Sequence, residues 1–331
     1  MSSILTNTAA MTALQTLQQT NEMMEATQNR ISSGLRITTA ADNSAYWSIA
    51  ATMKSDNSSL STVKDALGLG AATVDVAYTA MESATSLVTE IKSKLVAARQ
   101  PGVDKGKIQH EISQLQNQLK SVVGSASFSG ENWLINPSDG TDRATDGLPT
   151  ITKEIVSSFT RKADGTVETG KISITISDFI LIDEDGAAAN KSGLLDQATD
   201  NGAVVPGYAA GSGNGSGESV LNLKVQTVAG TVTTDKTEAQ IDVLIREITI
   251  VEDSMIDATA SLGAARNRIN LQNDFVANLM DAIDRGVGQL IDADMTEESS
   301  RLKSLQVQQQ LGIQSLSIAN ANAQNILALF R

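Results

Sequence analysis

The feature that most constrains this chain is an unbroken heptad stripe between residues 60 and 98. Small and apolar residues alternate there in steps of three and four, which keeps one side of a helix against a partner helix under left-handed supercoiling. Pro101-Gly102 then ends the pattern, because proline and glycine both interrupt helices. The stripe therefore predicts one long helix of a coiled coil. Its members are Leu60, Val63, Leu67, Gly70, Val74, Ala77, Met81, Ala84, Val88, Ile91, Leu95 and Ala98.

Related heptad patterns occur at both ends of the chain and after its centre. They predict a short return helix at 108–122 and a long helix at 241–287. The N-terminal pattern includes two polar seam positions, Asn21 and Gln28, so this helix is expected to be marginal alone. A polar seam residue typically fixes register at some cost in stability. The terminal seams comprise Ala10, Leu14, Leu17, Asn21, Met24, Gln28, Ile31 and Leu35, and Leu302, Leu305, Gln309, Gly312, Leu316, Ala319, Ala323, Ile326 and Phe330.

Between residues 137 and 237 the helical pattern gives way to proline, glycine, aspartate and alternating apolar residues. The alternation at 171–176 predicts a strand, with 151–160 as the other arm of a hairpin that turns at 163–166. Leu221, Leu223 and Val225 predict a third strand. Residues 207–217, rich in glycine and serine, predict a flexible loop. The centre is therefore expected to be a small β-rich module inserted into a helical protein.

The formal net charge is −13, which disfavours binding to nucleic acid or to anionic membranes. Residues 137–240 hold 15 acidic and 8 basic side chains, whereas residues 1–60 and 288–331 each hold 4 and 3. Nearly neutral amphipathic ends suit burial in an assembly, and an acidic centre suits a solvated surface. No apolar stretch approaches the ~18 residues of a membrane span.

No motif predicts a catalytic, cofactor or metal site. The chain has no cysteine and one histidine, His110. His110-Glu111 begins like a zinc-binding helix, but Gln114 stands where the second imidazole is required, so a solvated helix face is favoured. The acidic run 183–186 lacks the spacing and closing glutamate of a calcium loop and is expected to be a turn.

Several separated motifs resemble those of bacterial flagellins. The resemblance covers about residues 1–136 and 240–331, with the motifs in the same order along the chain. Residues 46–50 and 127–133 resemble the alphaproteobacterial, rhizobium-like branch of that family. The motifs are Arg30–Arg36, Ala41–Ala45, Leu262–Ile269, Asp292–Met295, Ile318–Asn320 and Ile326–Arg331.

The resemblance implies a mainly α fold, in which both chain ends form a long antiparallel coiled coil or helical bundle with a small inserted β-rich outer domain. Residues 1–44 and 296–331 would form the inner filament layer. Residues 45–136 and 238–295 would form spoke segments and a middle coiled-coil layer, with 137–237 as the variable outer domain. A hook–filament junction protein and a peptidase-bearing flagellin are the alternatives, the first disfavoured by the match at both ends and the second by the single histidine.

The resemblance also implies self-assembly into an extracellular flagellar filament for motility, with export by the flagellum and no cleaved signal peptide. Expected partners are further copies, co-expressed flagellins, hook-associated junction and cap proteins and an export chaperone, without nucleic acid, membrane insertion or a cofactor. We expect a non-enzymatic protein. The residues predicted for the assembly seam are Leu14, Leu17, Met24, Ile31, Leu35, Leu302, Leu305, Leu316, Ile326 and Phe330.

Overall fold

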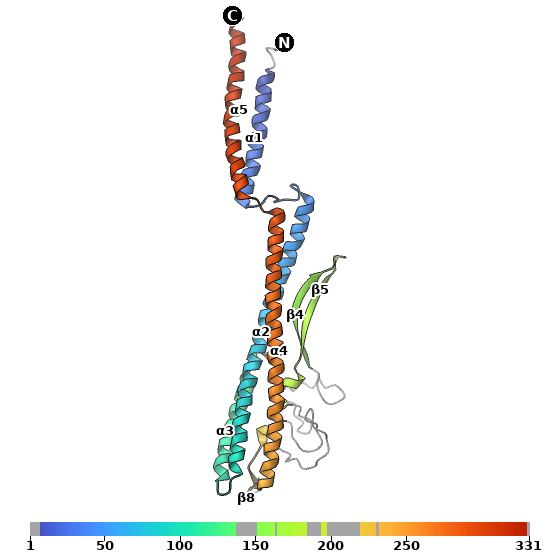
Figure 1. Cartoon of the computed structure of the whole chain (residues 1–331), viewed down its shortest axis with the longest axis vertical. Helices are drawn as coiled ribbons and strands as arrows, with labels where there is room; N and C mark the ends of the chain where they lie inside the picture. Colours follow the sequence, from blue (N-terminus) through green and yellow to red (C-terminus); the bar gives the residue numbers. More distant parts are fainter. Residues whose placement is uncertain are drawn as a thin grey trace. The chain divides into compact units, whose positions relative to one another are not determined.

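The computed structural model describes residues 7–136, 151–162, 164–183, 193–196, 219–229 and 232–329, without the side chains of 227–229, 232–234 and 322–329. The predicted loop at 207–217 and most of the predicted turn at 183–186 lie outside these residues. Helices dominate the fold, as predicted (Figure 1). They are α1 (Thr8–Ser33), α2 (Ser44–Ala98), α3 (Lys105–Ser125), α4 (Glu238–Ile291) and α5 (Met295–Leu329).

The chain divides into two compact units. Residues 1–59 and 278–331 form the first, called here the terminal unit, and residues 60–277 form the second, called the central unit. Both units combine segments from the two halves of the sequence, which confirms that the chain folds back on itself. Among the described residues, no helix has the length and apolarity needed to span a bilayer.

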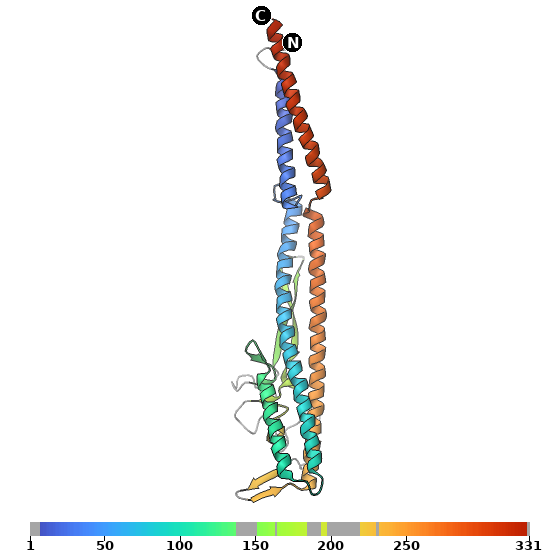
Figure 2. The same cartoon turned by 90° about the vertical axis from the view of Figure 1, so that its left-hand side faces the viewer.

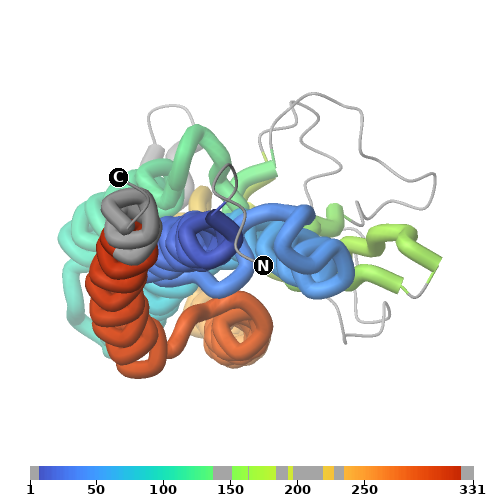
Figure 3. Tube along the Cα trace, turned by 90° about the horizontal axis from the view of Figure 1, so that it is seen from above, coloured from blue at the N-terminus to red at the C-terminus, as the bar shows by residue number. Residues whose placement is uncertain are grey.

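In the terminal unit, α1 and α5 lie side by side and run antiparallel (Figures 1 and 3). Helix α1 begins at an N-cap, because the Asn7 side chain accepts a hydrogen bond from the Ala10 N–H. It ends at Gly34, whose φ of 72° is a left-handed conformation that glycine adopts without steric cost. The Asn7 side chain and the conformation of Gly34 therefore define the two ends of this helix.

The heptad stripe lines the core of the central unit, where all twelve of its positions are buried on α2. Helix α4 runs antiparallel beside it and contributes a matching buried row (Figure 2). Ion pairs join the two helices on the outside, including Lys92–Glu252 at 2.6 Å and Arg99–Asp242 at 3.1 Å. The predicted coiled coil is confirmed. Its α4 row includes Ile241, Leu244, Ile248, Met255, Leu262, Ile269 and Val276.

Helix α3 is the predicted return helix. Its first turn is capped by the Asp104 side chain, which accepts hydrogen bonds from two backbone N–H groups, those of Gly106 and Lys107. His110 lies on its exposed side. Within the described part of the chain, no three histidine, aspartate or glutamate side chains gather closely enough to hold a metal ion.

The predicted hairpin is confirmed as strands β4 (Thr152–Arg161) and β5 (Val167–Thr175), which pair antiparallel. Gly70 of α2 allows this hairpin to approach closely, because a Cβ atom there would lie 2.7 Å from the Ile155 side chain. Shorter pairs accompany it: β1 (Ser127–Phe128) with β2 (Glu131–Asn132), and β3 (Ile135–Asn136) with β6 (Ile182–Asp183). A short 3₁₀ helix, η1, spans Ser177–Phe179.

The prediction of a third strand at Leu221, Leu223 and Val225 is wrong. These residues are buried, but a 3₁₀ helix, η2, spans Val220–Asn222. The reason lies in α3, whose Gln116 amide donates to the Val220 and Leu223 carbonyls. These carbonyls are hydrogen-bonded to a side chain and not to a neighbouring strand. The strand begins later, as β7 (Gln226–Ala229), and pairs with β8 (Val232–Asp235).

Candidate assembly interface

Helices α1 and α5 are joined along their length by polar contacts between residues far apart in the sequence. The Asn7 side-chain amide donates to the Ala319 carbonyl at 3.0 Å, and the Gln309 amide donates to Asn21 Oδ1 at 2.8 Å. Near the other end of the pair, Arg30 Nη1 lies 3.3 Å from Glu298 Oε1. These contacts define one antiparallel register for the two helices.

The contact face of α1 combines larger apolar side chains with small ones. Thr20 and Thr27 are each 3% exposed, although threonine is polar. Thr20 tolerates burial because its hydroxyl donates to the Thr16 carbonyl at 2.8 Å, within its own helix. On α5, Gly312 faces Leu17 so closely that a Cβ atom would lie 3.1 Å from Leu17 Cδ1. Small residues therefore bring the two helices close together.

This contact uses a different register from the predicted N-terminal seam. Positions 10, 17, 24 and 31 belong to both registers, but Thr20 and Thr27 occupy the buried positions between them. Asn21 and Gln28 lie one residue further on and are exposed. The sequence-based seam missed the threonines because it placed Leu14, and not Ala13, in the register, although the seven-residue spacing of the two threonines was a visible signal.

The structure places the predicted seam residues in different environments. Leu305 is 5% exposed in the contact with α1, whereas Leu14 is 46% exposed. Leu35 packs in a separate cluster beyond the end of α1. The half-buried members are Leu17, Met24, Ile31, Leu302 and Leu316. The Ile326 side chain and Phe330 lie outside the described residues, and the assembly role of all ten residues stays a prediction.

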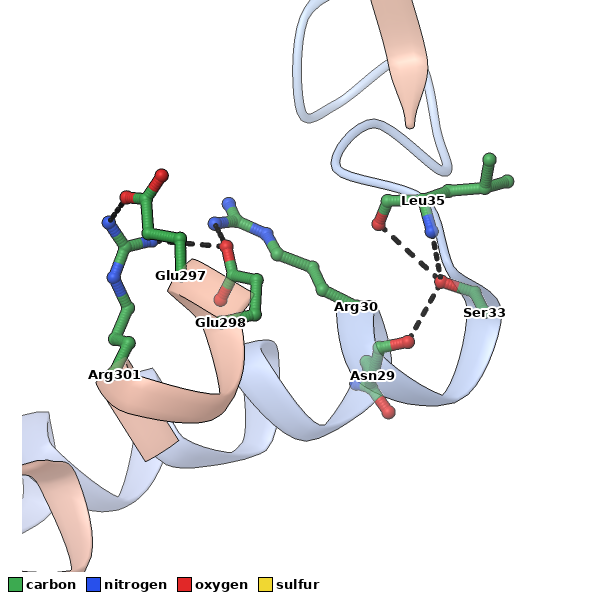
Figure 4. Close-up of polar contacts among 7 residues, drawn as sticks. All are labelled: Asn29, Arg30, Ser33, Leu35, Glu297, Glu298 and Arg301. Carbon is green, nitrogen blue, oxygen red and sulfur yellow. Dashed lines mark hydrogen bonds and ion pairs between the residues drawn. The ribbon is translucent and has the colours of Figure 1, made fainter. Parts of the chain in front are cut away.

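A network of charged side chains closes one end of the helix pair (Figure 4). Glu298 Oε1 accepts from Arg30 at 3.3 Å and from Arg301 at 3.2 Å, while Arg301 also reaches Glu297 at 2.9 Å. Glu297 and Glu298 lie in the first turn of α5, where negative charge is favourable to the helix dipole. The Glu298 side chain is 6% exposed, and burial of a charge is unfavourable unless it is paired. The guanidinium groups of Arg30 and Arg301 provide that pairing.

The two segments that follow α1 and precede α5 are hydrogen-bonded to each other. The Ala293 N–H donates to the Gly34 carbonyl at 2.9 Å, and the Arg36 N–H donates to the Ile291 carbonyl at 2.6 Å. The Arg36 side chain donates to the Leu290 carbonyl at 3.0 Å, so it satisfies the end of α4. A small apolar cluster lies beneath them. It comprises Ile37, Ala50, Val287 and Ile291, flanked by Leu35, Met53, Ile283 and Leu290.

The loop before α2 is organised by two adjacent residues, Asp42 and Asn43. Asp42 Oδ2 accepts hydrogen bonds from the backbone and hydroxyl groups of Thr38 and Thr39. The backbone N–H of Thr39, then the groups of Thr38, lower the pKa of Asp42 to about 2. The Asn43 side chain accepts from the Ala45 and Tyr46 N–H groups and caps α2. Both side chains of the motif therefore have a structural role in this loop.

The side of α5 that faces away from α1 also carries apolar side chains, although polar and apolar side chains are mixed around the helix as a whole. Val307, Leu311 and Ile318 occupy one heptad-spaced row and are 55%, 58% and 63% exposed. Ile313 is also exposed, at 54%, but on another side of α5, because it lies two residues from Leu311. A helix with apolar residues on several sides is normally surrounded by partners. The pair formed by α1 and α5 therefore leaves an apolar surface that a single chain does not cover.

These features define a class: a structural protein whose chain ends pair as helices and present apolar surface for assembly. The bacterial flagellin N-terminal helical region matches residues 4–138, and the bacterial flagellin C-terminal helical region matches residues 245–330. The chain belongs to the bacterial flagellin family. It is a structural subunit of the extracellular flagellar filament, which serves motility, and is not an enzyme.

Relatives match over their whole length. Flagellin C of Rhizobium meliloti strain 1021 is 50% identical over 334 residues, and flagellin A of Rhizobium meliloti is 43% identical over 403. A flagellin of Brucella melitensis is 40% identical over 332 residues. Each alignment covers 100% of both chains. These relatives confirm the resemblance to flagellins of the rhizobium-like type.

Proposed function

We propose that this flagellin polymerises through α1 and α5, whose outward apolar faces are covered by the terminal units of neighbouring copies. The observation that carries the proposal is the exposed row of Val307, Leu311 and Ile318 on the side of α5 away from α1. Full burial of such a side chain contributes about 1.5–3 kcal/mol, so covering the half-exposed row contributes several kcal/mol per subunit. The nearly neutral charge of both chain ends adds little repulsion between copies.

We further propose the layered division of the chain within the filament. Residues 1–44 and 296–331 form the inner layer, 45–136 and 238–295 the middle layer, and 137–237 the outer domain. The unmatched stretch between residues 138 and 245 supports a variable insert. The alignment with flagellin A also supports it, because its 403 positions exceed the 331 residues of this chain by 72. A family that accommodates such length differences requires a region that tolerates them.

The remaining partners belong to the same proposal. Differently lettered flagellins are named from Rhizobium meliloti, which supports co-assembly of this chain with other flagellins. Hook-associated junction proteins, cap proteins and an export chaperone would contact the same terminal helices before or at the ends of the filament. Exposed apolar helix faces are suitable surfaces for such partners.

The test uses the absence of cysteine in the sequence. A Leu311→Cys variant carries one thiol, and its reaction with a maleimide is measured in monomers and in filaments. We expect fast labelling in monomers and at least tenfold slower labelling in filaments. Val167→Cys is the matched control, because Val167 is 49% exposed in the β4–β5 hairpin and should react equally in both states. Equal labelling of Leu311→Cys in monomers and filaments would contradict the proposal.

A further inference from the structure

Three large side chains lie exposed on the first two turns of α2. Tyr46, Trp47 and Ile49 are 44%, 42% and 49% exposed. Their position is well defined, because Asn43 caps the helix directly before them. Aromatic side chains make up 3% of the sequence, so an adjacent exposed pair is a distinctive feature.

These side chains take no part in the neighbouring core. The buried side of the same helical turns is formed by Ala50 and Met53, which pack with Val287 and Ile291. Neither the Tyr46 hydroxyl nor the Trp47 indole N–H has a hydrogen-bond partner among the described residues. Buried tyrosine and tryptophan side chains normally find such partners, and both residue types are enriched in protein interfaces.

We propose that Tyr46, Trp47 and Ile49, called here the aromatic patch, dock against the terminal unit of a second copy of this chain. This contact is additional to the one made by α1 and α5, and it rests on the proposed assembly of the terminal units. A second copy offers the right chemistry, because eleven of the eighteen large hydrophobic side chains exposed in the described part of the chain lie in the terminal unit.

Charge also favours a second copy as the occupant. Residues 1–60 hold 4 acidic and 3 basic side chains, and residues 288–331 hold the same numbers, so two terminal units repel each other little. The aromatic patch directly follows the Asp42–Asn43 loop. A contact there restrains the connecting segments of adjacent subunits. The contact therefore stabilises filaments that the terminal helices have already formed.

Tryptophan fluorescence tests the proposal directly, because the chain has two tryptophans and Trp133 is 5% exposed. In a Trp133→Phe variant, Trp47 is the single reporter. We expect acrylamide quenching of Trp47 to fall at least threefold when monomers polymerise, with a blue shift of its emission. The matched Trp47→Phe variant retains the buried Trp133 and should show weak quenching in both states. Unchanged Trp47 quenching in filaments would overturn the proposal.

A second measurement covers the case in which Trp133→Phe does not fold. In the unsubstituted protein, the fraction of tryptophan emission that acrylamide quenches should fall on polymerisation, because Trp47 supplies the accessible part. A Tyr46→Ala, Trp47→Ala double variant should still form sedimentable filaments, but these should depolymerise at least 5 °C lower. Unchanged depolymerisation would contradict the proposal. Sedimentation and Leu311→Cys labelling report on the terminal helices separately, so failure of either proposal can be recognised.

Discussion

Truncating Leu305 to alanine should strongly weaken filament assembly. Leu305 is 5% exposed between α1 and α5, and the substitution removes three buried carbon atoms. At about 0.8 kcal/mol per buried carbon, the loss is roughly 2.4 kcal/mol. A larger cavity penalty is not expected, because a contact between two helices can close around the missing atoms. A free-energy loss of this size corresponds to roughly 60-fold in an equilibrium constant.

The assay is the critical concentration of polymerisation, measured by sedimenting filaments and quantifying the protein that stays in solution. Every added subunit has to form the α1–α5 contact, so the critical concentration of Leu305→Ala should rise between tenfold and about 60-fold. The matched control is Leu305→Met, a volume-conserving change that typically costs less than about 1.5 kcal/mol. A critical concentration for Leu305→Ala within twofold of the unsubstituted value would refute this reasoning.

Three further substitutions test other parts of the account. Leu316→Asp should block polymerisation at neutral pH while leaving the monomer folded, because a desolvated carboxylate is costly in the assembled contact, and Leu316→Met should be nearly silent in the same sedimentation assay. Asp42→Asn should lower thermal stability at neutral pH but not at pH 2. The pKa of Asp42 is depressed from 3.8 to about 2, so its stabilisation is present above pH 4 and is lost as the pH falls towards 2; an equal difference at both pH values would contradict this. Gly70→Ala should reduce hydrogen-exchange protection in β4, because the new methyl group meets Ile155, while exchange in α4 stays unchanged.

The long coiled coil could be predicted residue by residue. Its stripe is regular, and each predicted position is buried in α2. The helix also extends further than the stripe, since α2 begins at Ser44 and not near Leu60. Asn43 caps that earlier start, and most of residues 44–59 are exposed, so the heptad pattern does not extend there. Periodicity predicts packed helix faces better than helix ends.

The residues of α1 that face α5 were harder to predict. Two heptad registers are possible, and both contain positions 10, 17, 24 and 31. Hydrophobicity favoured Leu14 over Ala13, but the close approach of α5 favours small residues. Thr20 also satisfies its hydroxyl within its own helix, which removes the penalty that a polar residue would otherwise carry in the seam. The Arg30–Glu298 pair joins residues 268 positions apart, and no local pattern identifies such partners.

The third strand shows a different limit. The alternation of Leu221, Leu223 and Val225 correctly identified buried residues but not their conformation. Side chains of α3 determine that conformation, because Gln109 accepts from the Val225 N–H while Gln116 binds two carbonyls. The local alternation of residues contains no information about glutamines on another helix. The strand prediction was therefore wrong because tertiary contacts determine this conformation.

Helical reconstruction of the filament by electron cryo-microscopy would show how α1 and α5 pack in the assembled state. We predict that α1 and α5 pair within each subunit in the register fixed by Arg30–Glu298. We also predict that Val307, Leu311 and Ile318 each lie within van der Waals contact of a neighbouring copy. A reconstruction in which this row of α5 faces water, with subunits joined through other surfaces, would contradict this prediction.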